Sequence, residues 1–454
     1  MEKMKLKHLP FVLSILGFIL LTPPISANAE TLTLSATIEK ILQSQPRLKL
    51  EKEKLTQIDA HQRTVVAGAL PSVSSSLTWA RKEDALSSSA ALFNGDSYNT
   101  YSGLIEVVAP IYSGGKLSAA RRAADKDEKL QKLNIEKTER DLTVEGIQLF
   151  HRILLAQRSM ETVERLKVIQ EKLLSTAQRR YQVGNESKLS VLQIKTQLAL
   201  LAPQLTQGRN ELSILASELA DLAGMDDLHE LVIKGRLGPW SFQLPINKKA
   251  EERPEWKSLQ LNLARVSDER SVILAKHFPQ LAGFANISRY GYEFTNLGNS
   301  DNTAWNAGVR LTVPLFSGLE SVYERRELRS RELQLEYLAQ NMAKNLELSR
   351  VRAIQEFENA RDVESASLTA YKQAQEAVSV AQKNYQIGTS DYQQVSETQK
   401  QLADADRSFA RSQFQVLEAF TQCYVANGWN VSDLPKTIES ALIREMGKES
   451  GKAQ

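Results

Sequence analysis

The chain has 454 residues, 42% hydrophobic and 24% charged, which is the composition of a folded protein and excludes disorder and collagen. Its 57 basic and 54 acidic side chains leave a formal net charge of +3, so no nucleic-acid partner is expected on electrostatic grounds. The one cysteine excludes an internal disulfide framework and a multi-thiolate metal site. Stability must therefore come from packing.

Residues 1–29 have the pattern of a secretory signal peptide. Lys3, Lys5 and Lys7 precede an apolar run over 9–21, and Ala-Asn-Ala over 27–29 offers an A-x-A cleavage site. The alternative is a membrane anchor, but the run is shorter than the ~20 residues that a spanning helix needs. We expect export and a mature chain that begins at Glu30. No later apolar run reaches the length of a membrane helix.

The rest of the sequence is an internal duplication. Val-Ala-Pro-Ile-Tyr-Ser-Gly over 108–114 recurs as Thr-Val-Pro-Leu-Phe-Ser-Gly over 312–318, and Tyr-Gln-Val-Gly over 181–184 recurs as Tyr-Gln-Ile-Gly over 385–388. Both pairs are 204 positions apart, and chance matches would not hold one offset over this distance. We predict a first repeat over 30–224, a linker over 225–251, a second repeat over 252–428, and a C-terminal segment over 429–454 with a mobile tail from Ser440.

Each repeat contains the same predicted elements in the same order. Helices over about 35–67 and 252–276 come first, and after a strand pair and a Ser-Gly corner come long helical patterns over about 116–182 and 320–386. Some 66 residues at 1.5 Å each give a rod of about 100 Å. Each rod ends at a glycine, and a return helix runs to about 222 or 426. The unit is a helical hairpin with its tip at Gly184 or Gly388, and Pro203 predicts a kink in the first return helix.

Four stretches, about 72–80, 101–109, 281–290 and 305–313, are predicted as strands. Apolar and polar residues alternate from Val73 to Trp79 and from Trp305 to Val313, whereas 281–290 alternates poorly. Their lengths suit tilted membrane strands, although a soluble sandwich is the alternative. Four strands cannot close a membrane barrel, so several copies of the chain must share one.

The two corners and the two tips, repeated in register, resemble the TolC-like outer-membrane efflux proteins over essentially the whole mature chain. The resemblance implies a mainly α protein with membrane β-strands: a homotrimer with a shared 12-stranded β-barrel in outer-membrane lipid, and an α-helical barrel through the periplasm. Terminal and inter-repeat segments would form an equatorial region. The implied function is the exit duct of tripartite efflux or type I secretion. Its partners would be a periplasmic adaptor and an inner-membrane pump of RND, ABC or MFS type.

The same resemblance implies a periplasmic gate just after the tip of the second repeat. Tyr385 matches the family's gate tyrosine, whereas Ser390 stands where an arginine is usual and Ser190 where its acidic partner is usual. Of two acids that ring the entrance, Gln394 replaces one and Glu397 retains the other. We therefore expect a gate with fewer charged links and a ring of three carboxylates, one from each subunit, with weaker cation block.

Two further sets of residues are candidates for binding or for architecture. The hairpin tips would dock the adaptor through Val183, Gly184, Asn185, Ile387, Gly388 and Thr389. The strand-to-helix corners are marked by Pro110, Gly114, Pro314 and Gly318. Glycine at the tips is also what a tight turn requires, and the two roles are compatible.

Catalysis has no support in the sequence, and we expect neither an enzyme nor a cofactor or metal. No histidine stands at a metal-ligand spacing from another histidine or from cysteine, and no phosphate loop or nucleophile elbow occurs. Cys423 is expected to be a small buried residue. The competing hypotheses are a secreted or surface coiled-coil structural or binding protein and, with no candidate site, a periplasmic enzyme. The sequence does not identify the cargo.

Overall fold

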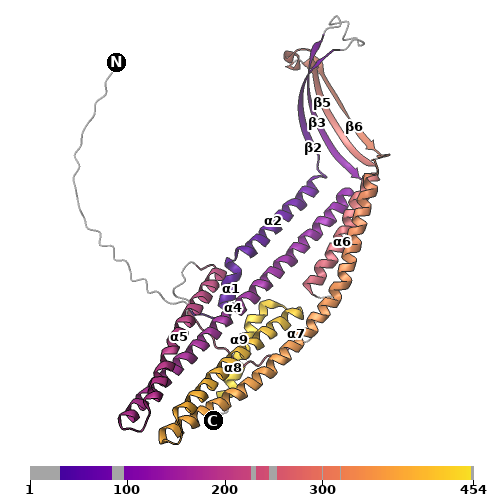
Figure 1. The fold of residues 1–454 in the computed structure, drawn as a ribbon. Helices are drawn as coiled ribbons and strands as arrows, with labels where there is room; N and C mark the ends of the chain where they lie inside the picture. Colours follow the sequence, from indigo (N-terminus) through magenta and orange to yellow (C-terminus); the bar gives the residue numbers. More distant parts are fainter. Residues whose placement is uncertain are drawn as a thin grey trace, which may run out of the picture.

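The computed structural model describes residues 31–83, 97–225, 232–244, 253–298, 300–316 and 318–450. Long helices run through most of the molecule, and a curved sheet lies at one end of them (Figure 1). The predicted signal peptide, parts of the predicted linker and the last four residues lie outside the described residues.

Two long hairpins form most of the protein. The first consists of α4 (Lys116–Gln182) and α5 (Lys188–Ala223), and the second of α7 (Glu320–Ile387) and α8 (Tyr392–Ala426). Each return helix is capped by a polar side chain: Ser187 accepts a hydrogen bond from the Ser190 amide, and Asp391 accepts one from the Gln394 amide. The predicted hairpins are confirmed, and α5 continues through Pro203.

The shorter helices lead towards the sheet. They are α1 (Leu34–Ser44), α2 (Pro46–Ala67) and α6 (Pro254–Leu274). The helical stretch predicted over about 35–67 consists of two helices, because the chain breaks at Gln45, whose φ of −58° and ψ of 122° are not helical. Steric conflict between a proline ring and the preceding residue excludes the helical conformation there, and Pro46 then begins a new helix.

The sheet has four antiparallel strands in the order β2-β3-β5-β6. They are β2 (Ser72–Lys82), β3 (Tyr98–Ser113), β5 (Gln280–Gly291) and β6 (Thr303–Thr312). The central pair, β3 with β5, joins the two repeats, so the poorly alternating stretch over 281–290 is also a strand. Within the described part of the chain, β2 and β6 each pair on one side only. One free backbone edge therefore remains on each side of the sheet.

Large apolar side chains of the sheet remain uncovered in the single chain. Six on the outer strands β2 and β6 are more than 60% exposed: Val73, Leu77, Trp79, Trp305, Val309 and Leu311. They alternate with polar neighbours along their strands, as the sequence predicted. At the far end of the sheet an aromatic cluster forms, in which Tyr98 and Tyr290 each contact Tyr292 edge to face. A broad apolar face and an aromatic border thus coincide on one sheet.

A compact core lies about midway along the helices. There Phe242 stacks on Phe420 with ring centroids 3.9 Å apart, and Trp240 stacks on Phe242 and donates its indole N–H to the Gln413 carbonyl at 2.8 Å. His151 beside Trp240 is fully buried, and burial lowers its pKa to about 4. The imidazole ring is therefore neutral at neutral pH.

The first and last described elements, β1 and α9, lie beside this core. β1 (Thr31–Leu32) pairs in parallel with β4 (Val232–Ile233), and α9 (Leu434–Ser450) packs on α1, where Ser35 donates two hydrogen bonds to Glu439. α9 continues past Ser440 as far as Ser450, and Leu434, Ile438 and Ala441 bury one face of its first half. Single 3₁₀ turns complete the described elements: η2 (Ala275–His277), η3 (Phe294–Gly298), η4 (Ser300–Asn302) and η5 (Val431–Asp433).

The strand-to-helix corners depend on left-handed backbone. Gly114 and Gly318 have φ of 65° and 66°, and the next residues, Gly115 and Leu319, have φ of 83° and 67°. Leu319 is the one non-glycine residue with positive φ among those described, a conformation that costs about 1 kcal/mol for a side chain with a Cβ. The corner of the second repeat is therefore strained where that of the first is not.

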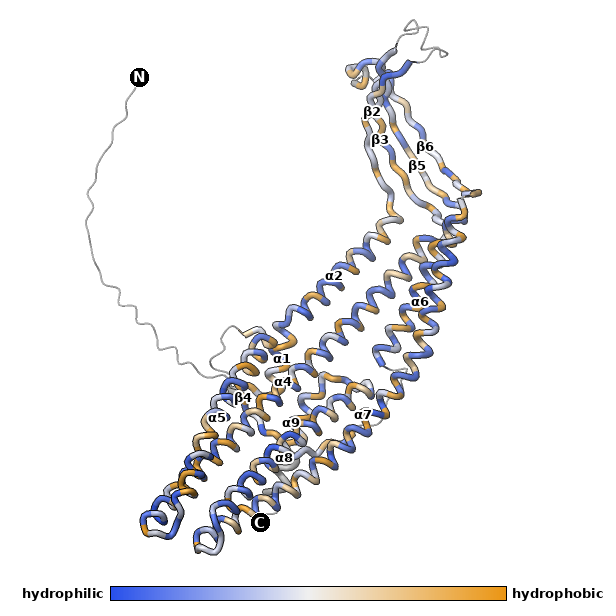
Figure 2. The backbone as a smooth tube through the Cα atoms, viewed as in Figure 1, coloured by the Kyte–Doolittle hydropathy of each residue, from blue (hydrophilic) through white to orange (hydrophobic). Residues whose placement is uncertain are grey.

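Hydrophobic and hydrophilic residues are interspersed along every long helix (Figure 2). Across the described ranges, no helix combines the length and apolar character that crossing a membrane requires.

Two helix-terminal glycines offer a matched test of the packing. Both Gly224 and Gly184 have positive φ, but a Cβ on Gly224 would lie 2.5 Å from Cβ of Ser44, whereas nothing lies within 4 Å of one on Gly184. We predict that Gly184→Ala costs about 1 kcal/mol, for the left-handed backbone alone. Gly224→Ala should cost about 3 kcal/mol, because α1 must also shift. Chemical denaturation of the solubilised variants measures both, and equal losses would contradict this packing.

Candidate functional site

The hairpin tips lie at the end of the molecule opposite the sheet (Figure 1). Gly184 and Gly388 make the turns with φ of 79° and 85°. Val183 and Ile387 stand beside them and are 70% and 73% exposed. Asn185 and Thr389 are exposed as well. Each tip thus presents one bare aliphatic side chain next to a polar turn, the arrangement of a small docking surface.

Behind the tips, a small apolar cluster joins the two hairpins. Tyr385 at the end of α7 is 1% exposed and lies at the centre of this cluster. The other members come from all four long helices: Ala177, Val191, Ile194, Ala381, Tyr392 and Val395. This cluster is separate from the main core, so it holds the two tips side by side independently of that core.

Polar contacts also fix Tyr385 to the first hairpin. Its hydroxyl donates to Oε2 of Glu186 at 2.8 Å, and Nη1 of Arg180 donates to the Tyr385 carbonyl at 2.6 Å. The Arg180 guanidinium lies 5.0 Å from the centre of the tyrosine ring. Burial, and then the hydrogen bond and charge of Glu186, raise the pKa of Tyr385 above its ordinary value. The phenol stays protonated and remains a donor.

The remaining predicted gate residues lie on the helix starts and do not reach Tyr385. Ser390 donates to Oε1 of Gln394 at 2.7 Å, and the hydroxyl of Ser190 is 2.9 Å from that of Ser187. Glu397 is exposed and accepts a hydrogen bond from Gln401 at 3.3 Å.

Glu186 and Arg180, which do bind Tyr385, were missed by the sequence analysis. Glu186 follows the tip glycine in a turn, and Arg180 belongs to a basic pair that ends the first long helix. The sequence does show one acidic and one basic side chain beside the same turn. It does not indicate that their common partner, Tyr385, lies 199 and 205 positions further along the chain.

Two further polar contacts join the hairpins between the tips and the core. The Asp406 side chain in α8 is 4% exposed and accepts from Arg158 of α4 at 2.8 Å and from Arg165 at 3.0 Å. Thr162 also donates to this carboxylate. Closer to the tip, the buried amide of Gln170 donates to Oε1 of Gln399 at 2.7 Å. We call the line of contacts from Asp406 to Tyr385 the internal seam.

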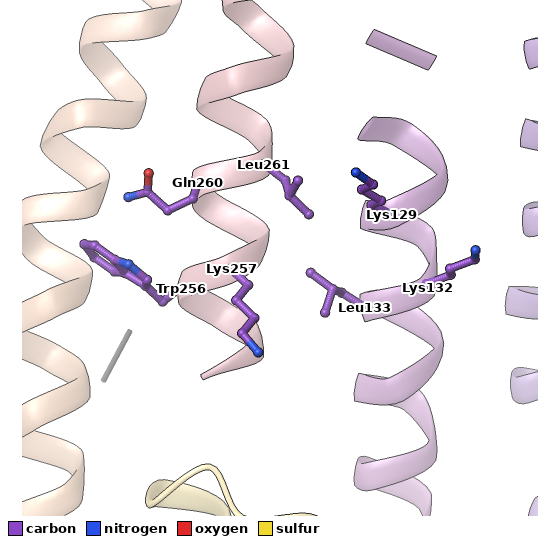
Figure 3. Close-up of a pocket in the computed structure, with 7 residues that line it drawn as sticks. All are labelled: Lys129, Lys132, Leu133, Trp256, Lys257, Gln260 and Leu261. Atoms are coloured by element: carbon purple, nitrogen blue, oxygen red, sulfur yellow. The ribbon is translucent and has the colours of Figure 1, made fainter. Parts of the chain in front are cut away.

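A groove of about 590 Å³ lies between α4 and α6 (Figure 3). Leu133 and Leu261 face each other across it, while Trp256 lies to one side. Its rim is basic: Lys129, Lys132 and Lys257. It lies far from the tips and contains no carboxylate, thiol or imidazole that could act as an acid, base or nucleophile.

Reactive and metal-binding groups are scarce in the described ranges. No group of three or more His, Cys, Asp or Glu side chains there could hold a metal ion. Cys423 is fully buried, as predicted, and burial raises the pKa of its thiol to about 11. A neutral buried thiol is unreactive. The candidate features at the hairpin tips are therefore the exposed tip residues and the contacts that join the two hairpins.

Comparison with known families identifies the class. The family model of the outer membrane efflux protein matches the chain twice, over residues 37–225 and 246–428. The chain therefore belongs to the outer membrane efflux protein family, a family of channels rather than enzymes, and the two matches correspond to the tandem repeats predicted from the sequence.

Two relatives have informative names. The alkaline protease secretion protein AprF of Pseudomonas aeruginosa is 24% identical over 243 residues, which cover 51% of this chain and 49% of that protein. The solvent efflux pump outer membrane protein SrpC of Pseudomonas putida is 24% identical over 264 residues, covering 55% and 54%. The chain thus spans about half the length of these relatives.

Solved structures share the fold over most of the chain. CusC, described for its folding and transmembrane channel formation, superposes with a TM-score of 0.77 at 16% identity, covering 87% of this chain and 92% of CusC. The outer membrane protein VceC of Vibrio cholerae gives 0.73 at 16% identity, covering 88% and 96%. The fold predicted from the resemblance to TolC-like proteins is thereby confirmed.

Two aspartates of α8 test the internal seam. Asp406→Asn should destabilise the protein by about 2 kcal/mol, because two arginines and Thr162 lose a buried carboxylate. Partial exposure of Arg158 and Arg165 keeps the loss below that of a fully buried pair. Asp404→Asn is the control, since Asp404 is 59% exposed and pairs only with Arg407 on its own helix, and should cost under about 0.5 kcal/mol. Urea unfolding compares them, and a similar small loss for both would contradict the seam.

Proposed function

We propose that this protein is the exit duct of a tripartite efflux or type I secretion system, located in the outer membrane and passing cargo without catalysis. The observation that carries the proposal is the four-stranded sheet, with one free edge on each side and a bare apolar face. In lipid every backbone N–H and C=O must be paired within protein, so such a sheet requires neighbours. Three copies supply twelve strands, enough to close a barrel with an open lumen.

The helices extend this barrel into an aqueous tunnel. α4 and α7 contain 67 and 68 residues, which at 1.5 Å per residue makes each about 100 Å long. Their largely polar faces suit a wall with water on both sides. In the trimer the six hairpins surround one passage, and the tips mark its inner end. An exported chain reaches this location through the predicted signal peptide, residues 1–29.

The passage has its gate at the tips. Tyr385 holds the two hairpins of each subunit together, and Ser390, Gln394 and Ser190 line the start of the return helices with hydroxyl and amide groups. Glu397 is the exposed carboxylate one turn further along α8. Three copies of Glu397 form the acidic ring that attracts cations to the entrance.

The partners are a periplasmic adaptor and an inner-membrane pump, which supplies the free energy. Val183 and Ile387, with the turns that carry them, are exposed at the tips and dock the adaptor. The names of the two relatives differ in cargo, one secreting a protease and the other exporting solvents. In this proposal the pump and the adaptor select the cargo, and the duct supplies only the passage.

Single-channel recording tests both the duct and its acidic ring. In planar bilayers the protein should conduct, and divalent cations added on the tip side should block the current. Glu397→Gln should raise the half-blocking concentration at least tenfold, because the carboxylates that attract the cation are lost. Glu53→Gln, at an exposed site on α2, is the control and should leave the block unchanged. Unaltered block in Glu397→Gln removes this residue from the entrance, and absence of conductance in the wild type rejects the duct.

A further inference from the structure

A cavity of about 590 Å³ with a mostly polar lining lies between the two hairpins, at the edge of the compact core. Its lining comes from α4, α7, α8 and the chain over 235–239 that follows β4. The volume falls in the range of small-molecule sites, about 300–1,000 Å³. All of these lining residues belong to one chain, so the cavity is complete without a second copy.

The segment after β4 forms one wall of the cavity, and the core fixes this wall in place. Gln413 of α8 donates its side-chain amide to the Gly238 carbonyl, and Trp240 donates its indole N–H to the Gln413 carbonyl at 2.8 Å. A Cβ on Gly235 would lie 2.8 Å from Cδ1 of Leu154, so glycine alone fits this close to α4. The cavity is therefore preformed, and little of the chain has to be ordered when a ligand enters.

The lining carries positive charge that the protein itself does not use. Among the described residues, neither Arg236 nor Lys372 makes a hydrogen bond or an ion pair, and both side chains are exposed. Arg158 also lines the cavity and donates from Nη2 to Asp406 at 2.8 Å. Glu161 is the one acidic residue of the described lining. Positive charge thus exceeds negative, which favours an anionic ligand.

An aromatic pair contributes a flat part of the wall. Tyr371 of α7 and Phe409 of α8 stack with their ring centroids 5.7 Å apart and their planes 16° apart, and both line the cavity. Within the described part of the chain the Tyr371 hydroxyl has no hydrogen-bond partner, so it is free to donate to a ligand oxygen. Aromatic rings beside unpaired cations suit a ligand that has both a flat apolar body and an anionic group.

We propose that this cavity binds a small organic anion with an aromatic body, of the class of the aromatic carboxylates. Arg236 and Lys372 bind the carboxylate, because both are charged and unpaired. Tyr371 and Phe409 contact the ring. A bound ligand touches both hairpins and stabilises the fold. The site goes beyond the proposed function, since it needs neither a channel nor a second copy of the chain.

Fluorine NMR with 4-fluorobenzoate as the probe tests the site on the detergent-solubilised full chain. Binding broadens the fluorine signal, and a titration gives the Kd. Arg236→Gln with Lys372→Gln should weaken binding at least about tenfold, because two charge-assisted hydrogen bonds are lost. Glu161→Gln should tighten it about threefold, because a negative charge near the carboxylate is removed.

A matched control replaces one arginine and one lysine outside the lining. Arg209→Gln with Lys172→Gln changes the net charge by the same amount at exposed sites on α5 and α4, and should leave the Kd unchanged. The neutral probe 4-fluorobenzamide should bind at least about tenfold more weakly than 4-fluorobenzoate, because it carries no charge for the two cations. Tyr371→Leu should weaken 4-fluorobenzoate about threefold, because the stacked ring is lost.

Four results would each overturn the proposal. They are no saturable binding, equal weakening by the control pair, equal affinity for the neutral and the anionic probe, and a Kd for 4-fluorobenzoate that Tyr371→Leu leaves unchanged. The third would mean partition into the detergent, and the fourth a site for any anion. Conductance plays no part in these measurements, so the ligand site and the proposed duct stand or fall separately.

Discussion

The pairing of backbone hydrogen-bonding groups at the edges of a four-stranded sheet is the constraint on which the rest of this structure depends. β2 and β6 each leave one edge open, and the apolar face formed by residues such as Trp79 and Trp305 is uncovered. In water, open edges and a bare apolar face both favour association with further chains, and in lipid the open edges are excluded. Association of identical chains satisfies both at once, so the proposed membrane location and the proposed oligomer share a single physical cause.

The two repeats share a backbone plan but differ in side-chain chemistry. Gly115 at the first corner corresponds to Leu319, which adopts the same left-handed conformation with strain. Tyr385 is buried with Glu186 and Arg180, whereas Tyr181 is exposed and corresponding charges are lacking at Ser390 and Asn384. The two tips of one chain therefore differ in chemistry: one tyrosine is buried with charged partners, and the other is exposed.

Local physics accounts for the parts of the fold that the sequence predicted. Local sequence patterns predict the long helices, the glycine turns between them and the alternating strands. The constant offset between the repeats then supports each of these predictions a second time. The chemistry at the tip was not predictable in this way. Tyr385 was named, but its partners Glu186 and Arg180 are some 200 positions away, and only the packed hairpins bring them together. The sequence analysis also gave no helix for the C-terminal segment, where Leu434 and Ile438 bury one face of α9 before the charged stretch begins.

The most direct test of the account is the mass of the purified protein. Multi-angle light scattering in detergent, corrected for bound detergent, should give three chains, and the oligomer should fall to single chains only on heating in denaturing detergent. Removal of detergent should precipitate the protein, because the apolar face of the sheet is then exposed to water. A monodisperse single chain in plain buffer would contradict the account, since the free edges of β2 and β6 would then need no neighbour.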